Sequence, residues 1–239
     1  MSTSPGKARI TWLGHSTVKI TSPGGKEILI DPWVANNPAT PPEHKNIDRL
    51  DLMLITHGHF DHIGDAVDIA KRTTPQVVCI FETGHWLQSK GVENVNAMNK
   101  GGAQVVEGIA VTMTHAIHSC GITDGDRLIY GGEAAGYVIR LEDGFTIYHA
   151  GDTALFGDMR LIGEFYKPDL AMLPIGDFYT MDPRQAARAV EFLGVKRVLP
   201  MHYGTFPILT GTPAALREAL QGLPGEPVDI VEAKPGDTF

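Results

Sequence analysis

Short apolar runs separated by turn residues predict that strands make up much of this chain. Thr17–Thr21 alternates apolar and polar side chains, as a strand with one buried face does. Asp51–Ile55 is apolar after its first residue, which predicts a strand buried on both faces. The apolar positions within Ile63–Ala70 recur at helical spacing. The change of period between these two stretches predicts a strand followed by a helix.

The same patterns predict further strands at Ala8–Leu13, Glu27–Ile30, Gln76–Phe81, Gln104–Val106, Ile109–Thr114, Tyr137–Leu141, Phe145–His149, Asp169–Leu173, Arg197–Pro200 and Val228–Val231. Helices are predicted at Glu82–Lys90, Asp182–Leu193 and Thr212–Leu220, the last two with proline at the first helical position. Strands alternate with helices in both halves of the chain, which favours two similar halves with their sheets packed together and helices outside. Because no linker separates the halves, residues 1–239 are expected to form a single domain.

The charge balance is acidic, since 28 aspartates and glutamates against 20 lysines and arginines give a net charge of -8. An acidic chain is a poor default partner for nucleic acid or an anionic membrane surface. The two cysteines, Cys79 and Cys120, indicate no disulfide scaffold, which fits a reducing compartment. Met1–Lys7 lacks the apolar core of a signal peptide, and no apolar run reaches membrane-spanning length. We expect a cytoplasmic protein with a small-molecule substrate and without nucleic-acid or membrane partners; the sequence is compatible with a homo-oligomer.

The stretch Thr56–His62 places four metal-capable side chains within six positions, between the buried strand and the helix. The carboxyl end of a strand is where α/β sheets usually build their sites. If the backbone is extended at His57 and His59, both imidazoles point to the same side and converge on one point. Asp61 and His62 lie where the helix begins, so they face a second point nearby. Burying these groups without partners would be costly and exposing them would not explain their clustering, so a metal site is favoured over structural histidines.

Other predicted strand ends also carry histidine or aspartate, at Gly14–His15, His115–Ser119, His149–Thr153 and Met201–Tyr203. Each is a weak signal alone, because a single histidine is more often structural than functional. Their repeated position just after strands would gather them along one sheet edge. His44 and His85 do not share this position and are expected to be ordinary surface or packing residues.

The order His-x-His-x-Asp-His, a later histidine, Gly-Asp-Thr and a late histidine resembles the metallo-β-lactamase superfamily over nearly the whole chain. More narrowly, Trp12–Ser16, His149–Thr153, Pro174–Asp177 and Pro200–Pro207 are similar to a bacterial family of uncharacterised metal-dependent hydrolases. That family is related to ascorbate-phosphate lactonase and to the N-acyl-phosphatidylethanolamine phospholipase D group. The resemblance implies an αββα sandwich of two mixed sheets with helices on the outer faces and two divalent metal ions at one edge.

The resemblance also implies which side chains bind the two ions. One ion would take His57, His59 and His118, the other would take Asp61, His62 and His202, and Asp152 would bridge them. His115 is a rival for His118, which is preferred because it directly precedes Ser119 as the aligned ligand of the narrower family does. Imidazole and carboxylate ligands without thiolate suit zinc, manganese, iron or nickel, and zinc is the first choice.

Two such ions about 3.5–4 Å apart can share one hydroxide, whose pKa the metals bring near neutrality. Asp61 and Asp152 would orient that hydroxide. By the resemblance His15 lies beside the site and could donate a hydrogen bond or a proton; the alternative is a turn histidine bonded to backbone. Asp31 could hydrogen-bond a ligand histidine. Tyr203 and Asp177 are weaker candidates for the site, and Tyr203 could serve only in packing.

Three functional classes remain open: a hydrolase of a small lactone, ester or amide, a phosphodiesterase of the phospholipase D type, and a non-hydrolytic iron oxidoreductase or metal-binding protein. Few basic residues lie near the site motifs, which disfavours phosphate, although helix amino ends could substitute. The glutamate that diiron reductases carry in place of His59 is absent. The hydrolase is therefore favoured, with Trp33–Lys45 and Phe178–Met181 as the loops that control access.

Overall fold

The strands assemble into two sheets in the computed structural model of the chain, which describes residues 8–223 and 226–239. The first sheet holds six strands in chain order: β1 (Arg9–Gly14), β2 (Thr17–Thr21), β3 (Glu27–Ile30), β4 (Leu52–Leu54), β5 (Gln76–Ile80) and β6 (Val95–Met98). β1, β2 and β3 pair antiparallel, whereas β3 to β6 pair in parallel. Tight turns suffice for the antiparallel strands, and the parallel strands need the longer crossovers that carry helices.

The second sheet repeats this plan with seven strands. In spatial order they are β15 (Asp229–Ile230), β14 (Arg197–Met201), β13 (Leu170–Pro174), β12 (Thr146–His149), β11 (Ala135–Arg140), β8 (Ile109–His115) and β7 (Ala103–Val106). β7, β8, β11 and β12 pair antiparallel, and β12 to β15 pair in parallel. Between β8 and β11 the chain forms a separate hairpin of β9 (Gly121–Asp124) and β10 (Arg127–Tyr130).

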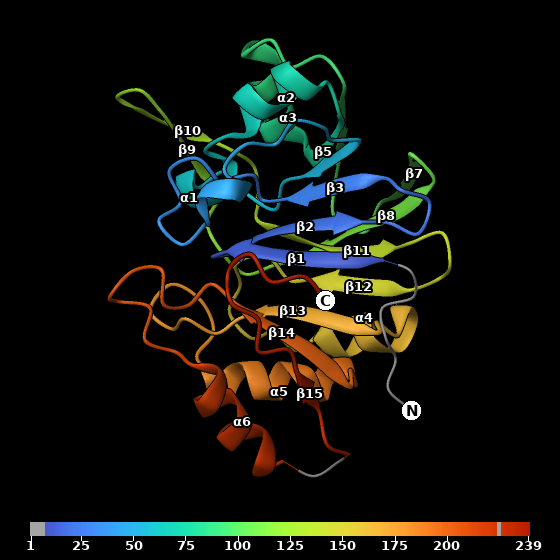
Figure 1. Cartoon of the computed structure of the whole chain (residues 1–239), viewed down its shortest axis with the longest axis vertical. Coiled ribbons are helices and arrows are strands. Elements are labelled where there is room, and N and C mark those ends of the chain that lie inside the picture. Colours follow the sequence, from blue (N-terminus) through green and yellow to red (C-terminus); the bar gives the residue numbers. More distant parts are fainter. Residues whose placement is uncertain (1–7, 224–225) are drawn as a thin grey trace.

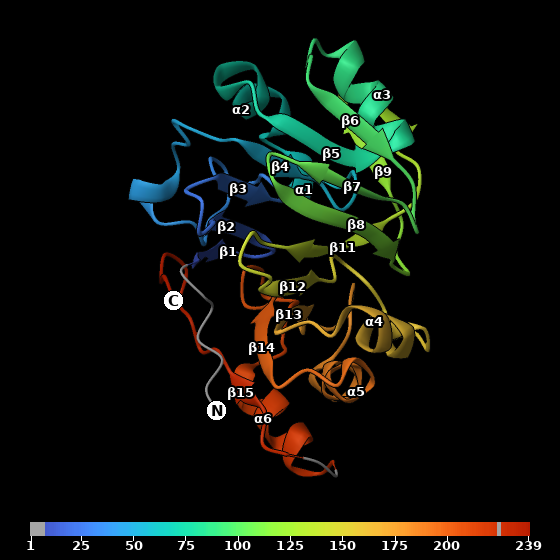
Figure 2. The same ribbon diagram turned by 90° about the vertical axis from the view of Figure 1, so that its right-hand side faces the viewer.

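The apolar core between the sheets explains the alternation along the strands. Leu52 and Leu54 of β4 face a core built from both sheets, whereas Met53 packs on the other face with α2 (Ala66–Thr73) and α3 (Phe81–Ser89). The outer face of the second sheet is covered by α4 (Met159–Tyr166), α5 (Pro183–Leu193) and α6 (Pro213–Gln221). Figures 1 and 2 show these two groups of helices at opposite ends of the molecule with the strands between them. The predicted αββα sandwich is therefore confirmed.

The strand directions bring the functional stretches to one edge. In the first sheet β1, β3 and β4 run the same way, because two antiparallel pairings separate β1 from β3. In the second sheet β8, β12, β13 and β14 run the same way for the same reason. Each of these strands is followed by one of the stretches that contain metal-capable side chains or their neighbours. The predicted gathering of strand ends along one edge thus follows from the topology.

The helix predicted at Ile63–Ala70 is two helices, a single-turn α1 (Phe60–Ile63) followed by α2. The break at Asp65 has a tertiary cause, because its carboxylate accepts hydrogen bonds from the backbone N–H groups of Val34 and Ala35 at 2.6 and 2.9 Å. The sequence prediction also missed β6, the β9–β10 hairpin and α4. Cys79 is buried, as predicted.

Within residues 8–223 and 226–239, every helix is too short or too polar to cross a membrane. Met1–Lys7, on which the expectation of no signal peptide rests, lie outside the described residues.

Candidate metal centre

The first donor set consists of three imidazole nitrogens that meet beside a carboxylate. Nε2 of His57 lies 3.0 Å from Nδ1 of His59, which lies 3.2 Å from Nε2 of His118. Oδ2 of Asp152 lies 3.9 Å from Nε2 of His57 and 3.7 Å from Nε2 of His118. His57 and His59 come from the loop after β4, while His118 and Asp152 follow β8 and β12. The set therefore joins the two halves of the chain.

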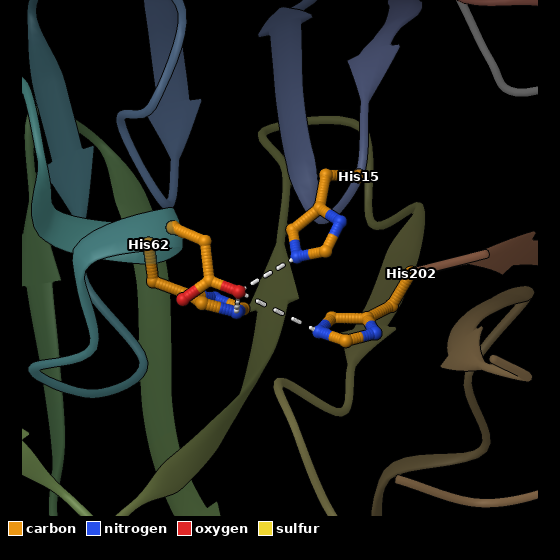
Figure 3. Close-up of side chains that lie close together, drawn as sticks. His15, His62 and His202 are labelled. Atoms are coloured by element: carbon orange, nitrogen blue, oxygen red, sulfur yellow. Dashed lines mark hydrogen bonds and ion pairs between the residues drawn. The ribbon is translucent and has the colours of Figure 1, made fainter. Parts of the chain in front are cut away.

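The second donor set shares the same carboxylate oxygen. Oδ2 of Asp152 lies 3.2 Å from Nε2 of His62 and 3.0 Å from Nε2 of His202. Oδ2 of Asp61 lies 4.0 Å and 3.9 Å from the same two nitrogens. Figure 3 shows the rings of His15, His62 and His202 close together. Nε2 of His15 also lies near Oδ2 of Asp61, at 2.9 Å. The two sets together contain the seven side chains that the family resemblance implied as metal ligands.

The donor distances fit metal ions of ordinary size. A tetrahedral zinc site has ligand–ligand edges of about 3.3–3.6 Å, given zinc bonds of about 2.0–2.2 Å to nitrogen and oxygen. The donor–donor distances within each set, between 3.0 and 4.0 Å, bracket that edge. Among the described residues Oδ1 of Asp152 is buried and has no hydrogen-bond partner. Facing lone-pair donors and an unpartnered buried carboxylate oxygen are what a bound cation would satisfy.

Asp31 and Thr56 fix the orientation of a histidine in each set. The Asp31 carboxylate accepts a hydrogen bond from Nδ1–H of His62 and another from the Thr56 hydroxyl, both at 2.8 Å. Because the hydroxyl gives its single proton to Asp31, it accepts from Nδ1–H of His57, 3.0 Å away. Nε2 of both His57 and His62 is thereby left toward the donor sets. Asp31 bonds a site histidine as the sequence suggested, whereas the part of Thr56 had no sequence signal.

His15 forms a hydrogen bond with the carboxylate of Asp61. Its Nε2 lies 2.9 Å from Oδ2 of Asp61, and its Nδ1 lies 3.0 Å from the hydroxyl of Thr205. The side chain is fully buried. Burial, reinforced by the positive charge that His202 can carry, lowers the pKa of His15 to about 4. A neutral His15 can donate Nε2–H to Asp61 while Nδ1 accepts from Thr205.

Burial also keeps imidazoles of the first set neutral. It lowers the pKa of His57 well below the ordinary value, and it lowers the pKa of His118. A neutral imidazole retains one lone pair, which is the form that binds a metal. With Nδ1 of His57 bonded to Thr56, the lone pair of His57 belongs to Nε2.

The carboxylates of the centre stay ionised in spite of burial. Burial opposes the charged form of Asp61, but His62 and the hydrogen bond from His15 lower its pKa to about 2. Burial likewise opposes the charged form of His62, but Asp152, Asp31 and Asp61 together raise its pKa well above the ordinary value. The positive charge on His62 therefore balances the carboxylates of buried Asp31 and Asp152 and of partly buried Asp61, and a divalent cation could neutralise the same negative charge.

Three residues around the centre adopt the left-handed backbone conformation, His15 at φ 55°, Asp31 at φ 51° and His202 at φ 56°. Residues other than glycine rarely adopt this conformation. Those that do are often found at functional sites, where the surrounding structure holds them in it. Each directly follows the last residue of a strand. The sharp turn aims each side chain along the sheet edge.

The remaining candidates lie outside the two donor sets. His115 is exposed, with Nδ1 3.1 Å from Nζ of Lys100. His149 is buried, and its Nε2 lies 3.1 Å from the backbone oxygen of Ser16, so it ties the two halves together. Tyr203 stacks on Trp12 with ring centroids 5.4 Å apart, which agrees with a packing role. Asp177 caps its own turn, accepting from the N–H of the next residue at 2.7 Å.

A cleft of about 520 Å³ opens over the donor sets. Its lining includes Asp61, Asp152 and the exposed apolar side chain of Leu128 on β10. The sequence pointed to Phe178–Met181 as an access loop, and Tyr179 of that loop lines the cleft. The contribution of β10 was missed. A larger hollow of about 880 Å³ beside α4 and α5 contains none of the seven donors, so size does not identify the site.

Comparison with known proteins gives consistent matches. Residues 26–203 match a family model described as a beta-lactamase superfamily domain. The UPF0173 metal-dependent hydrolase of Koribacter versatilis is 60% identical over 231 residues, covering 97% of each chain. Its counterpart in Solibacter usitatus is 56% identical over 226 residues, covering 95% of this chain and 98% of the relative. The solved structure of Igni18, a novel metallo hydrolase from Ignicoccus hospitalis, has a TM-score of 0.83 at 37% identity and covers 97% of both chains.

Proposed function

The chain belongs to the UPF0173 metal-dependent hydrolases of the metallo-β-lactamase superfamily, and on that premise we propose that two divalent ions serve it in hydrolysing a small lactone, ester or amide. The first ion would be held by His57, His59 and His118, and the second by Asp61, His62 and His202. Asp152 would bridge them. Zinc is the first choice, because the donors are imidazole and carboxylate without thiolate; manganese, iron and nickel share that preference.

One observation carries the proposal of two ions. Oδ2 of Asp152 lies within 3.9 Å of imidazole nitrogens in both donor sets, so one carboxylate can serve both. Seven side chains exceed what a single tetrahedral ion takes. A mononuclear site would leave three of these buried or half-buried groups without a function.

The ions would supply a water ionised near neutral pH and would polarise the carbonyl of the substrate. Side chains of the protein would orient the attacking water. Asp61 is ionised and lines the cleft, so it can accept a hydrogen bond from the attacking water and orient it. His15 does not reach the cleft surface, and its part is to hold Asp61 through Nε2–H. The water oxygen bonds to the carbonyl carbon, the bond to the leaving oxygen or nitrogen breaks, and that atom takes up the proton.

We further propose that the chain acts in the cytoplasm on a dissolved small molecule, without a nucleic-acid or membrane partner. The net charge of -8 supports this, because anionic polymers and surfaces would be repelled. The size of the cleft supports a small substrate, since small-molecule sites typically measure about 300–1,000 Å³.

The decisive experiment combines metal analysis with the Asp152→Ala variant. We expect two equivalents of metal per wild-type chain, weakened binding of both in the variant, and chelator-sensitive hydrolysis of at least one lactone, ester or amide by the wild type only. Asp68→Ala, at an exposed position of α2, is the matched control. Binding of a single ion at saturation would contradict the dinuclear proposal. Consumption of oxygen by an iron-loaded chain that hydrolyses no substrate would replace the hydrolase with an oxidoreductase.

A further inference from the structure

The mouth of the cleft is rimmed by large apolar side chains that the metal centre does not need. Leu128 of β10 is 79% exposed, and Ile208, in the loop after β14, is 41% exposed. Tyr179 and Phe60 add two more exposed apolar surfaces, and all four line the cleft. Apolar side chains gathered around a polar site are unfavourable in water unless something covers them, so they mark a binding surface.

The hairpin that carries Leu128 is fixed in place by its other face. Ile122 of β9 is buried against the metal-binding loop, where a side chain at Gly58 would come within 2.4 Å of it. Asp124 at the end of β9 accepts hydrogen bonds from Nζ of Lys90 at 2.7 Å and from Nε1 of Trp86 at 3.2 Å. Trp86 lies in the last turn of α3, and Lys90 is the residue after that helix. The hairpin is thus a preformed wall, and a preformed wall lowers the entropic cost of binding.

Side chains alternate between the two faces of the hairpin. Ile122 and Asp124 lie on the anchored face, and the residues that alternate with them lie on the open face. Leu128 pairs with Thr123, and Gly121 lies on the same face, because residues two apart on a strand share a face. The Leu128 side chain lies over Gly121, where a Cβ would be only 2.8 Å from it. All three residues line the cleft. The open face therefore presents one apolar surface beside His118 and Ser119.

The charge of the cleft restricts what can occupy this surface. Asp61 and Asp152 supply negative charge, and the lining described for the cleft includes no lysine or arginine. Lys90, the cation held near the base of the hairpin, is already paired with Asp124. A phosphate or carboxylate group of a substrate that extends beyond the ions would find no lysine or arginine in the cleft lining to pair with. An uncharged substrate chain needs no such partner.

We propose that the open face of the β9–β10 hairpin, with Leu128 at its centre, binds the aliphatic arm of an uncharged acyl substrate. This inference rests on the proposed hydrolase function and narrows its substrate to esters, lactones or amides with a straight apolar chain. Water adds to the acyl carbon, the bond to the alcohol oxygen or amine nitrogen breaks, and the products are a carboxylic acid and an alcohol or amine. No oxidant or further reactant is required.

The test compares chain length in activity and in binding. The metal-loaded full chain is assayed on straight-chain p-nitrophenyl esters from acetyl to octanoyl, with bis(p-nitrophenyl) phosphate alongside. We expect kcat/KM to rise about two- to fourfold per added methylene, the range set by burying a CH₂ group. Leu128→Lys should flatten the series, with a loss of about tenfold or more in kcat/KM at octanoyl. Leu161→Lys, an exposed leucine on α4 outside the cleft, should keep the wild-type series.

A second measurement does not depend on catalysis. Calorimetric titration of the chelator-treated protein with straight-chain primary amides from acetamide to octanamide should show Kd falling with chain length in wild type and Leu161→Lys. In Leu128→Lys that dependence should be lost. Ester hydrolysis with neither rates nor binding rising with chain length would overturn the inference and leave the proposed function standing. A preference for the phosphodiester would overturn both the inference and the proposed function. Chain-length-dependent binding without hydrolysis of any ester would support the inference and overturn the proposed function.

Discussion

At the scale of single residues, one carboxylate outside both donor sets orients the histidines of the centre. Asp31 accepts from His62 directly and from His57 through the Thr56 hydroxyl. It therefore sets the direction of one imidazole in each donor set. Outer hydrogen bonds of this kind fix the tautomer of a ligand histidine and raise its basicity.

We predict that Asp31→Asn weakens binding of both ions by about 10- to 100-fold, because outer-shell substitutions at metal sites typically cost that much. Thr56→Val should weaken only the ion held by His57. The measurement is competition with a chelator of known affinity. Asp51→Asn, at a partly buried aspartate that bonds the N–H of Glu27, is the matched control. Equal affinities in wild type and Asp31→Asn would show that Asp31 only supports the fold.

The second residue-scale prediction separates the two histidines that follow β8. His118→Ala should reduce bound metal by one equivalent, because Nε2 of His118 lies 3.2 Å from Nδ1 of His59. His115→Ala should keep both ions, because His115 contacts Lys100 at the surface. Elemental analysis of the two variants after identical loading decides the point. Metal loss confined to His115→Ala would reverse the assignment.

The sequence could predict position along the chain better than the direction of a side chain. His149 and His118 each lie at or just after a strand end, yet His149 bonds the backbone of Ser16 while His118 joins a donor set. The spacing of His57, His59, Asp61 and His62 predicted their convergence because only local geometry is involved. The parts of Thr56 and Thr205 depend on contacts across the fold, so no local pattern carries them.

At the scale of elements, the β9–β10 hairpin is the piece that the sequence signalled and the strand prediction overlooked. Asp124-Gly125 flanked by Ile122 and by Leu128 to Tyr130 is a strong hairpin pattern. The break between α1 and α2 is a different case. It depends on Asp65 bonding a distant loop, which helical periodicity does not report.

Contact between the hairpin and the metal-binding loop gives an element-scale prediction. Gly58→Ala places a methyl group 2.4 Å from Cγ1 of Ile122, so the Ile122 side chain or the hairpin that carries it must shift. We expect the free energy of unfolding to fall by about 1–3 kcal/mol, the usual cost of overpacking. The double variant Gly58→Ala/Ile122→Ala should lose less than the sum of the single losses, as measured by denaturant unfolding. Gly157→Ala, which meets no atom within 4 Å, is the control; strict additivity would mean that the two residues do not interact.

At the scale of the whole molecule, the metal centre lies across the junction of two half-molecules. The first donor set takes His57 and His59 from the loop after β4, and the second takes Asp61 and His62 from α1. The remaining donors of each set come from the second half. The apolar core is also shared, since Leu54 of the first sheet and Tyr137 of the second belong to one buried cluster. Neither half could keep its inner sheet face covered alone. The proposal of a single domain therefore carries an expectation about cooperativity.

We predict that residues 1–239 unfold in one transition whose midpoint depends strongly on metal. A ligand that binds only the folded state at about 1,000 times its Kd adds about 4 kcal/mol to the free energy of unfolding. For a chain of this size each kcal/mol corresponds to about 2–4 °C in Tm, so one ion at that excess should raise Tm by about 8–16 °C. Thermal unfolding followed with and without a chelator measures the shift.

Asp152→Ala is the matched variant for this measurement, because it removes the carboxylate that both donor sets share while leaving the shared apolar core in place. Its Tm should depend little on chelator, and its unfolding should remain a single transition. Two separate transitions in the metal-free wild type would mean that the halves are held together by the ions and not by the core. A wild-type Tm that does not change when chelator is added would mean that the ions do not connect the halves. The convergence of the seven side chains would then need another explanation.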